Sequence, residues 1–80
     1  MTHTEQYNKV FTDVFEIGAD ELNGQLAIRK HPRWDSIMHL SLISRIEDEF
    51  DIMLDPEDIL GFGSYPVGKS ILAKYGITVD

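Results

Sequence analysis

The chain has 80 residues, of which 42% are hydrophobic and 26% are charged, so it can form one small globular domain, 1-80, without a second core. Its 14 acidic and 7 basic residues give a formal net charge of -7, which argues against a nucleic-acid partner and favours proteins with basic patches. The absence of cysteine excludes disulfides, a thiol nucleophile and thiolate metal sites, and it suits a reducing compartment.

The N-terminal residues 1–6 lack the basic and apolar regions of a signal peptide. No apolar run approaches the length of a membrane span. We therefore expect a soluble, cytoplasmic protein with no membrane partner.

The first predicted helix runs from about Thr4 to Ile17, and Gly18 is expected to end it. Its apolar residues recur at spacings of three and four, which places them on one stripe: Tyr7, Val10, Phe11, Val14 and Phe15.

A long loop follows over residues 19–34. We expect it to be ordered, because it contains apolar residues that can anchor it across the helices: Leu22, Leu26, Ile28 and Trp34. Its basic cluster is interpreted as a solvated face: Arg29, Lys30, His31 and Arg33.

The second helix is expected over residues 36–50, with its boundary at Asp35-Ser36. Apolar residues again recur at helical spacing: Ile37, Leu40, Ile43, Ile46 and Phe50.

A short third helix is predicted after Asp55, which is suited to cap it, with Pro56 at its first position and Gly61 near its end. Ser64 is expected to cap the last helix, and Gly76-Ile77 predicts a Schellman stop. The apolar stripe of that helix is predicted to be Val67, Ile71, Leu72 and Tyr75. The predicted fold is all-α, a four-helix bundle with three longer helices, one short third helix and a long loop between helices 1 and 2.

Ser36 is the residue best placed for chemistry. We expect its hydroxyl to be exposed at the positive end of the second helix, beside backbone N–H groups without helical partners. A covalently attached phosphate would be favoured in that field.

Several motifs together resemble the acyl carrier protein family, and the resemblance covers most of the chain. Asp35-Ser36-Ile37 resembles the family's Asp-Ser-Leu attachment motif, and residues 46–52 are similar to the acidic end of its second helix. Phe62 and the closing segment 72–77 are also similar to the family.

The resemblance implies that Ser36 bears a 4'-phosphopantetheine arm derived from coenzyme A. It implies that Asp35 helps a phosphopantetheinyl transferase to position the serine and its metal. The thiol of the arm would carry acyl or aminoacyl groups between loading and condensing enzymes of fatty acid, polyketide or nonribosomal biosynthesis. The chain itself would be a monomeric carrier and not an enzyme.

Partner docking in this family is electrostatic, and the resemblance assigns it here to acids of the second and third helices: Glu47, Asp48, Asp51, Glu57 and Asp58. Met38 and His39 are expected to be exposed beside the arm, so that Met38 could contact a partner enzyme directly.

The chain departs from carriers of housekeeping fatty-acid synthesis. Met38 and Ser41 replace acids, and Ser44 stands where a large apolar residue often lines the acyl pocket. Trp34 stands directly before the motif, where many fatty-acid carriers have a segment that contains glycine. Its simpler role is to anchor the loop by packing. These differences favour a pathway-dedicated carrier whose cargo is not a long fatty chain.

Three other functions compete with that of a carrier. A Ser36–His39 nucleophile and base pair is rejected, because a hydrolase also needs an orienting acid, an oxyanion hole and a concave site, which so short a chain is expected scarcely to provide. The histidines lack metal-ligand spacing and residues 51–58 lack a calcium-loop pattern, so no metal site is predicted. The rival that stays open is a non-catalytic acidic helical adaptor, in which Asp35-Ser36 is merely a helix cap and an apolar seam binds a partner helix.

Overall fold

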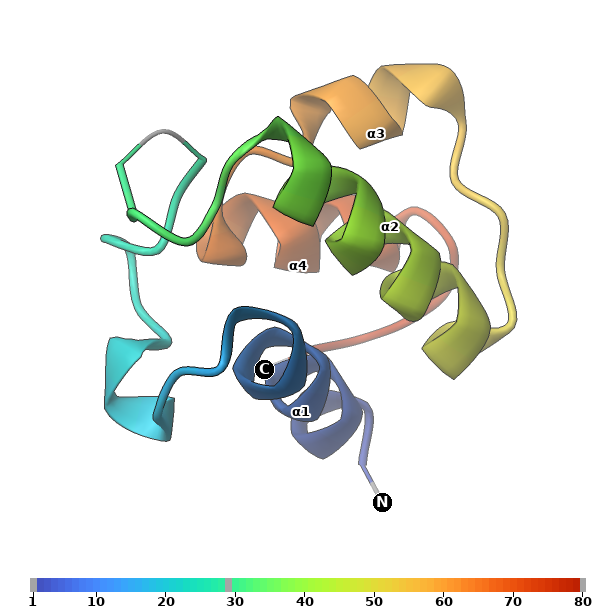
Figure 1. The fold of residues 1–80 in the computed structure, drawn as a ribbon. Helices are drawn as coiled ribbons and strands as arrows, with labels where there is room; N and C mark the ends of the chain where they lie inside the picture. Colours follow the sequence, from blue (N-terminus) through green and yellow to red (C-terminus); the bar gives the residue numbers. More distant parts are fainter. Residues whose placement is uncertain (1, 29, 80) are drawn as a thin grey trace.

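The computed structural model describes residues 2–28 and 30–79, and Figure 1 shows the arrangement of their helices. A short 3-10 helix, η1 (Ala19–Glu21), lies between the first two α-helices. The described residues form four α-helices: α1 (His3–Phe15), α2 (Ser36–Phe50), α3 (Pro56–Gly61) and α4 (Tyr65–Ala73). They contain an isolated bridge between Ala27 and Ser64 but no β-strand, so this part of the chain is all-helical, as predicted. None of its helices is long and apolar enough to cross a membrane.

Side-chain caps begin three of these helices, α1, α2 and α4. At α1, the N–H of Glu5 donates to Thr2 Oγ1 at 3.1 Å, and the Glu5 carboxylate accepts in return from the Thr2 N–H at 3.4 Å. At α4, Ser64 Oγ accepts from the Val67 N–H at 3.2 Å, as expected. Asp55 occupies the N-cap position of α3 and Pro56 its first position, as predicted, but Asp55 makes no side-chain cap bond.

The predicted end of α1 is wrong, because the helix stops at Phe15 and does not reach Gly18. Glu16 takes the left-handed conformation, with φ 53°, and its N–H donates to the Thr12 carbonyl. The Ile17 N–H donates to the same carbonyl at 3.3 Å, which turns the chain back towards the core.

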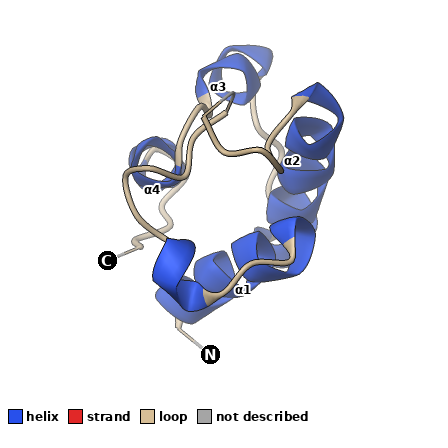
Figure 2. Ribbon diagram, turned by 60° about the vertical axis from the view of Figure 1, so that its left-hand side comes forward, coloured by secondary structure: helices blue, strands red, loops and turns tan. Residues whose placement is uncertain are grey.

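Aromatic rings fill the core around Phe11. Its ring centroid lies 4.7 Å from Tyr7, 5.2 Å from Tyr65 and 5.8 Å from Trp34. The predicted stripe of α1 faces this core, with only Val14 half-buried. α1 packs most extensively against α2, and this packing holds α2 in place (Figures 1 and 2).

The predicted stripe of α2 is wrong in its first half. Ile37 and Leu40 are 76% and 66% exposed, whereas the buried face is formed by Leu42, Ile43 and Ile46. Each step of three residues falls short of a full helical turn by about 60°. A series of such steps therefore winds around α2, and its first members point away from the core.

The long loop is ordered, as predicted. Its backbone pairs with the connection between α3 and α4, since the Ile28 N–H donates to the Gly63 carbonyl and the Tyr65 N–H donates to the Leu26 carbonyl, each at 2.9 Å. Leu26 and Trp34 are fully buried anchors.

The basic cluster of the loop is only partly a solvated face. Lys30 and Arg33 are exposed, but His31 is half-buried, with its Nε2 2.7 Å from Glu21 Oε1. Arg29 lies outside the described residues.

The chain turns back after α4 at the predicted Schellman stop. Gly76 has φ 80°, and the Ile77 N–H donates to the Leu72 carbonyl at 3.1 Å, which buries Ile77. Val67 was expected in the buried stripe of α4 but is 43% exposed, and Gly68 is buried instead.

Candidate functional site at the start of α2

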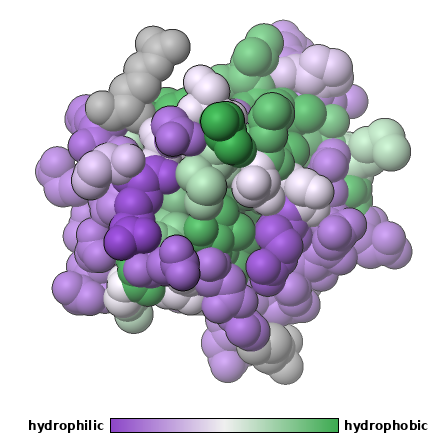
Figure 3. All heavy atoms as spheres, in the orientation of Figure 1, coloured by the Kyte–Doolittle hydropathy of each residue, from purple (hydrophilic) through white to green (hydrophobic). Residues whose placement is uncertain are grey.

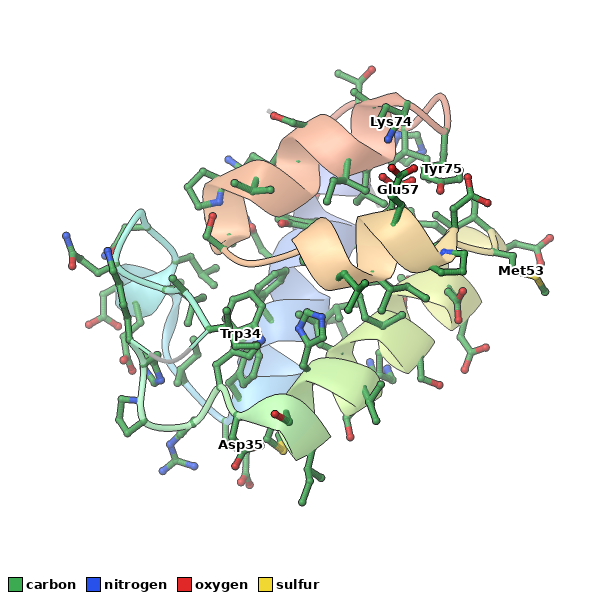
Figure 4. The ribbon with its side chains drawn as sticks, turned by 90° about the horizontal axis from the view of Figure 1, so that it is seen from above. Trp34, Asp35, Met53, Glu57, Lys74 and Tyr75 are labelled. Carbon is green, nitrogen blue, oxygen red and sulfur yellow. The ribbon has the colours of Figure 1, made fainter. Side chains whose placement is uncertain are left out.

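Ser36 is exposed and is the first residue of α2, as predicted. Asp35 before it is extended, and its Oδ1 accepts from the Met38 N–H at 2.9 Å, which fixes the first turn of the helix (Figure 4). The Ser36 hydroxyl makes no hydrogen bond to any residue in 2–28 or 30–79. It is therefore accessible and unengaged at a helix N-terminus, where negative charge is favoured.

A groove of about 510 Å³ opens beside this hydroxyl, between the long loop, α2 and α3. Its walls are mostly apolar and are formed by Ile28, Ser36, His39, Leu40, Ile59 and Leu60. Leu60 in this lining is 86% exposed, and Ile37, which follows Ser36 on α2, is 76% exposed. Figure 3 shows hydrophobic side chains gathered over the start of α2 and over α3.

His39 lines the groove, but it is not the surface residue that the sequence suggested. It is half-buried, and its ring stacks on Trp34 with the centroids 6.0 Å apart. The Trp34 Nε1–H donates to His39 Nδ1 at 3.0 Å, and His39 Nε2 lies 2.7 Å from the Ile59 carbonyl oxygen. Because both ring nitrogens are engaged, His39 is not placed to act as a base for Ser36.

Met38 also differs from the expectation of an exposed partner contact. Its side chain is half-buried and packs against the core. Trp34 is 1% exposed and its ring lies 5.1 Å from that of Phe15, so it serves as the packing anchor of the loop.

Asp58 was predicted to belong to an exposed docking face, and the structure corrects this. It is 7% exposed, and it accepts from Lys74 Nζ at 2.6 Å and from Tyr75 Oη at 2.5 Å. Figure 4 shows Lys74 and Tyr75 at the end of α4 next to α3. These two hydrogen bonds lower the pKa of the Asp58 carboxyl below its ordinary range, and the bond from Lys74 has the larger effect. Asp58 therefore joins α3 to the end of α4.

The other predicted docking acids are placed differently from one another. Glu47 is half-buried, and its Oε2 accepts from the Leu54 N–H at 2.9 Å, so it stabilises the connection after α2. Asp48, Asp51 and Glu57 are exposed, as expected. Sequence reasoning missed the exposed Met53, which is 83% exposed on the same connection (Figure 4).

No three side chains of the kinds that bind metals are grouped to hold an ion anywhere in residues 2–28 and 30–79. No protein-family model, curated protein or solved structure matches the chain. The chain's own residues around Ser36 are therefore the basis for assigning its function.

Proposed function

We propose that the chain is an acyl carrier protein in which Ser36 bears a 4'-phosphopantetheine arm. The observation that supports this best is an exposed, unbonded hydroxyl on the first residue of α2, directly after an aspartate. The resemblance of Asp35-Ser36-Ile37 to the attachment motif gives that hydroxyl its proposed chemistry. The four helices would then form the bundle of such carriers, as a monomer acting in the cytoplasm.

Attachment would be carried out by a phosphopantetheinyl transferase. Ser36 Oγ would form a bond to the phosphorus of the phosphopantetheine half of coenzyme A, the bond to the nucleotide half would break, and the serine proton would pass to a base of the transferase. Asp35 is exposed and uses Oδ1 to cap the helix, which would leave Oδ2 for the metal of the transferase. The resulting phosphodiester would lie at the positive end of α2.

The thiol of the arm would carry an acyl or aminoacyl group as a thioester. Enzymes that load and condense such groups would dock over the exposed apolar residues Ile37, Leu40 and Leu60, beside the groove. The exposed acids Asp51 and Glu57 would meet basic residues on those enzymes, which speeds their encounter. The polar Ser44 on α2 favours a dedicated pathway over long fatty chains.

The rival proposal is a non-catalytic adaptor, and the same apolar surface at Ile37, Leu40 and Leu60 favours it. An adaptor would bind its partner without any modification of Ser36. The two proposals therefore differ in one covalent bond.

Intact-mass spectrometry after incubation with coenzyme A and a promiscuous phosphopantetheinyl transferase tests this difference. The carrier proposal expects the mass to rise by one phosphopantetheine in the wild type and not at all in Ser36→Ala. Ser41→Ala, which removes another exposed serine of α2, is the matched control and should still be modified. An unmodified wild type would favour the adaptor.

A further inference from the structure

The hydrogen bonds of His39 determine where its proton lies. An indole N–H is only a donor, so the Nδ1 atom that receives it from Trp34 must carry a lone pair and no proton. The neutral ring then has its proton on Nε2, which donates to the Ile59 carbonyl at 2.7 Å. One imidazole in this single tautomer joins the loop before Ser36 to α3.

Both partners of this ring depend on it. Trp34 is buried among the rings of Phe11 and Phe15, and its indole N–H has no other acceptor among the described residues. Ile59 lies near the end of α3 and lines the groove that also contains Ser36. The His39 ring therefore links a buried residue of the loop to a residue of α3 that lines the groove.

We propose that His39 is a protonation-sensitive latch. While its Nδ1 is unprotonated, the ring holds α3 and Trp34 against the Ser36 end of α2. When Nδ1 gains a proton, the ring releases Trp34. A protonated Nδ1 would be a second donor facing the indole N–H, so this hydrogen bond would be lost and a buried donor left unpaired. Histidine is the side chain that ordinarily changes charge between about pH 5 and pH 8. The latch would thus loosen the end of the loop before Ser36 in mild acid, while the bond from Nε2 to the Ile59 carbonyl is kept.

The other ionisable groups on the surrounding segments do not occupy the ring nitrogens. Asp35 accepts from the Met38 N–H, His31 of the loop faces Glu21, and Asp58 on α3 binds Lys74 and Tyr75. The remaining described ionisable groups on the loop and on α3 are exposed: Asp20, Lys30, Arg33 and Glu57. None of these groups therefore competes with Trp34 or Ile59 for the ring nitrogens of His39.

The latch can be tested on the unmodified full chain, whereas its influence on an arm at Ser36 rests on the proposed function. Trp34 is the one tryptophan of the sequence, so its indole signal in a ¹H–¹⁵N spectrum is unambiguous. Between about pH 8 and pH 5 we expect this signal and the amide signals of Ile59 and Leu60 to shift along one titration curve. The protection of the indole N–H against solvent exchange, corrected for its intrinsic pH dependence, should fall about tenfold or more.

Two glutamine variants make this test specific. His39→Gln retains an acceptor and a donor without titrating, so its indole signal should not respond to pH. His31→Gln removes a histidine whose ring faces Glu21, while the backbone carbonyl that accepts from the Trp34 N–H at 3.1 Å is kept, so it should retain the wild-type response. A flat indole signal in the wild type, a response that survives His39→Gln, or one that disappears in His31→Gln would overturn the proposal.

A measurement on the wild type keeps the test valid if His39→Gln does not fold. Long-range ¹H–¹⁵N spectra at about pH 8 report which ring nitrogen bears the proton. The latch requires protonated Nε2 and bare Nδ1 on His39. Observation of the opposite tautomer would refute it, whether or not Ser36 can be modified.

Discussion

Gly68 of α4 lies so close to Tyr7 of α1 that a Cβ atom added to it would stand 2.2 Å from the tyrosine Oη. The same atom would stand 2.3 Å from Cζ of Phe62. Tyr7 and Phe62 are both fully buried, and the Tyr7 hydroxyl donates to the Tyr65 carbonyl at 2.6 Å. The bare backbone of Gly68 is therefore what allows α4 to approach α1.

We predict that Gly68→Ala lowers the free energy of unfolding by about 1–3 kcal/mol or more, because the buried rings have no free space into which to move. Urea unfolding measures this. Gly61→Ala is the matched control, since Gly61 also lies in a helix and a Cβ there meets nothing within 4 Å. It should be neutral or stabilising by up to about 1 kcal/mol, and equal effects of the two variants would contradict the packing argument.

Asp58 should make the stability of the protein sensitive to acid. Hydrogen bonds from Lys74 and Tyr75 hold the pKa of Asp58 below its ordinary value in the folded chain. A carboxyl of this kind contributes stability above its unfolded pKa, and the contribution is lost as the pH falls through the folded pKa. We expect Asp58→Asn to be less stable than the wild type at about pH 7 and the difference to narrow towards about pH 3.

Urea midpoints of both proteins across this pH range provide the measurement. Asp48→Asn removes the same charge from an exposed position of α2 and should not reproduce the narrowing. If the difference between Asp58→Asn and the wild type stayed constant with pH, the hydrogen-bonded carboxylate would not be the source of the effect.

The parts of the fold that were predicted correctly depend on local signals. The bounds of α2 follow from the aspartate before Ser36 and from the helical run that ends at Phe50. The turn at Gly76 follows from a glycine directly after an apolar helix, which is a local signature as well. Such signals involve residues a few positions apart and can be read in the sequence.

The wrong predictions concern contacts between residues far apart in the sequence, or the side of a helix on which a residue lies. Asp58 looked like one more exposed acid because its partner Lys74 lies 16 positions further along the chain. His39 looked like a surface residue because the carbonyl that it meets, at Ile59, is 20 positions away. Ile37 was assigned to the core by a spacing that drifts around α2, and its exposure is instead a feature of the candidate site.

The cap at Asp35 gives a prediction that separates folding from modification. Asp35→Ala removes the acceptor of the Met38 N–H and should lower stability by about 1 kcal/mol, whereas Asp35→Asn retains an acceptor and should be close to the wild type. If Asp35 also positions the metal of a transferase, Asp35→Asn should remain folded and yet be modified more slowly at Ser36. Thermal unfolding and the modification rate measure the two effects. Modification of Asp35→Asn at the wild-type rate would limit Asp35 to capping.

The net charge of -7 should make the fold sensitive to salt. Raising sodium chloride from about 0.02 M to about 0.5 M should increase the Tm by a few degrees, because it screens repulsion among the exposed acids. Combining Asp48→Asn with Asp51→Asn removes two of the 14 acidic charges and should reduce that increase. Asparagine tolerates the left-handed conformation of Asp51, so the turn after α2 should survive. A Tm that is unchanged or lower in salt would contradict this account of the acidic surface.

The central claim is that the hydroxyl of Ser36, and no other group, receives the phosphopantetheine arm. Tandem mass spectrometry of the wild-type chain, after treatment with coenzyme A and a transferase, locates the added group on its residue and tests this claim most directly. The account predicts one arm per chain, on Ser36. An unmodified chain, or an arm on Ser41 or Ser44 of the same helix, would contradict it.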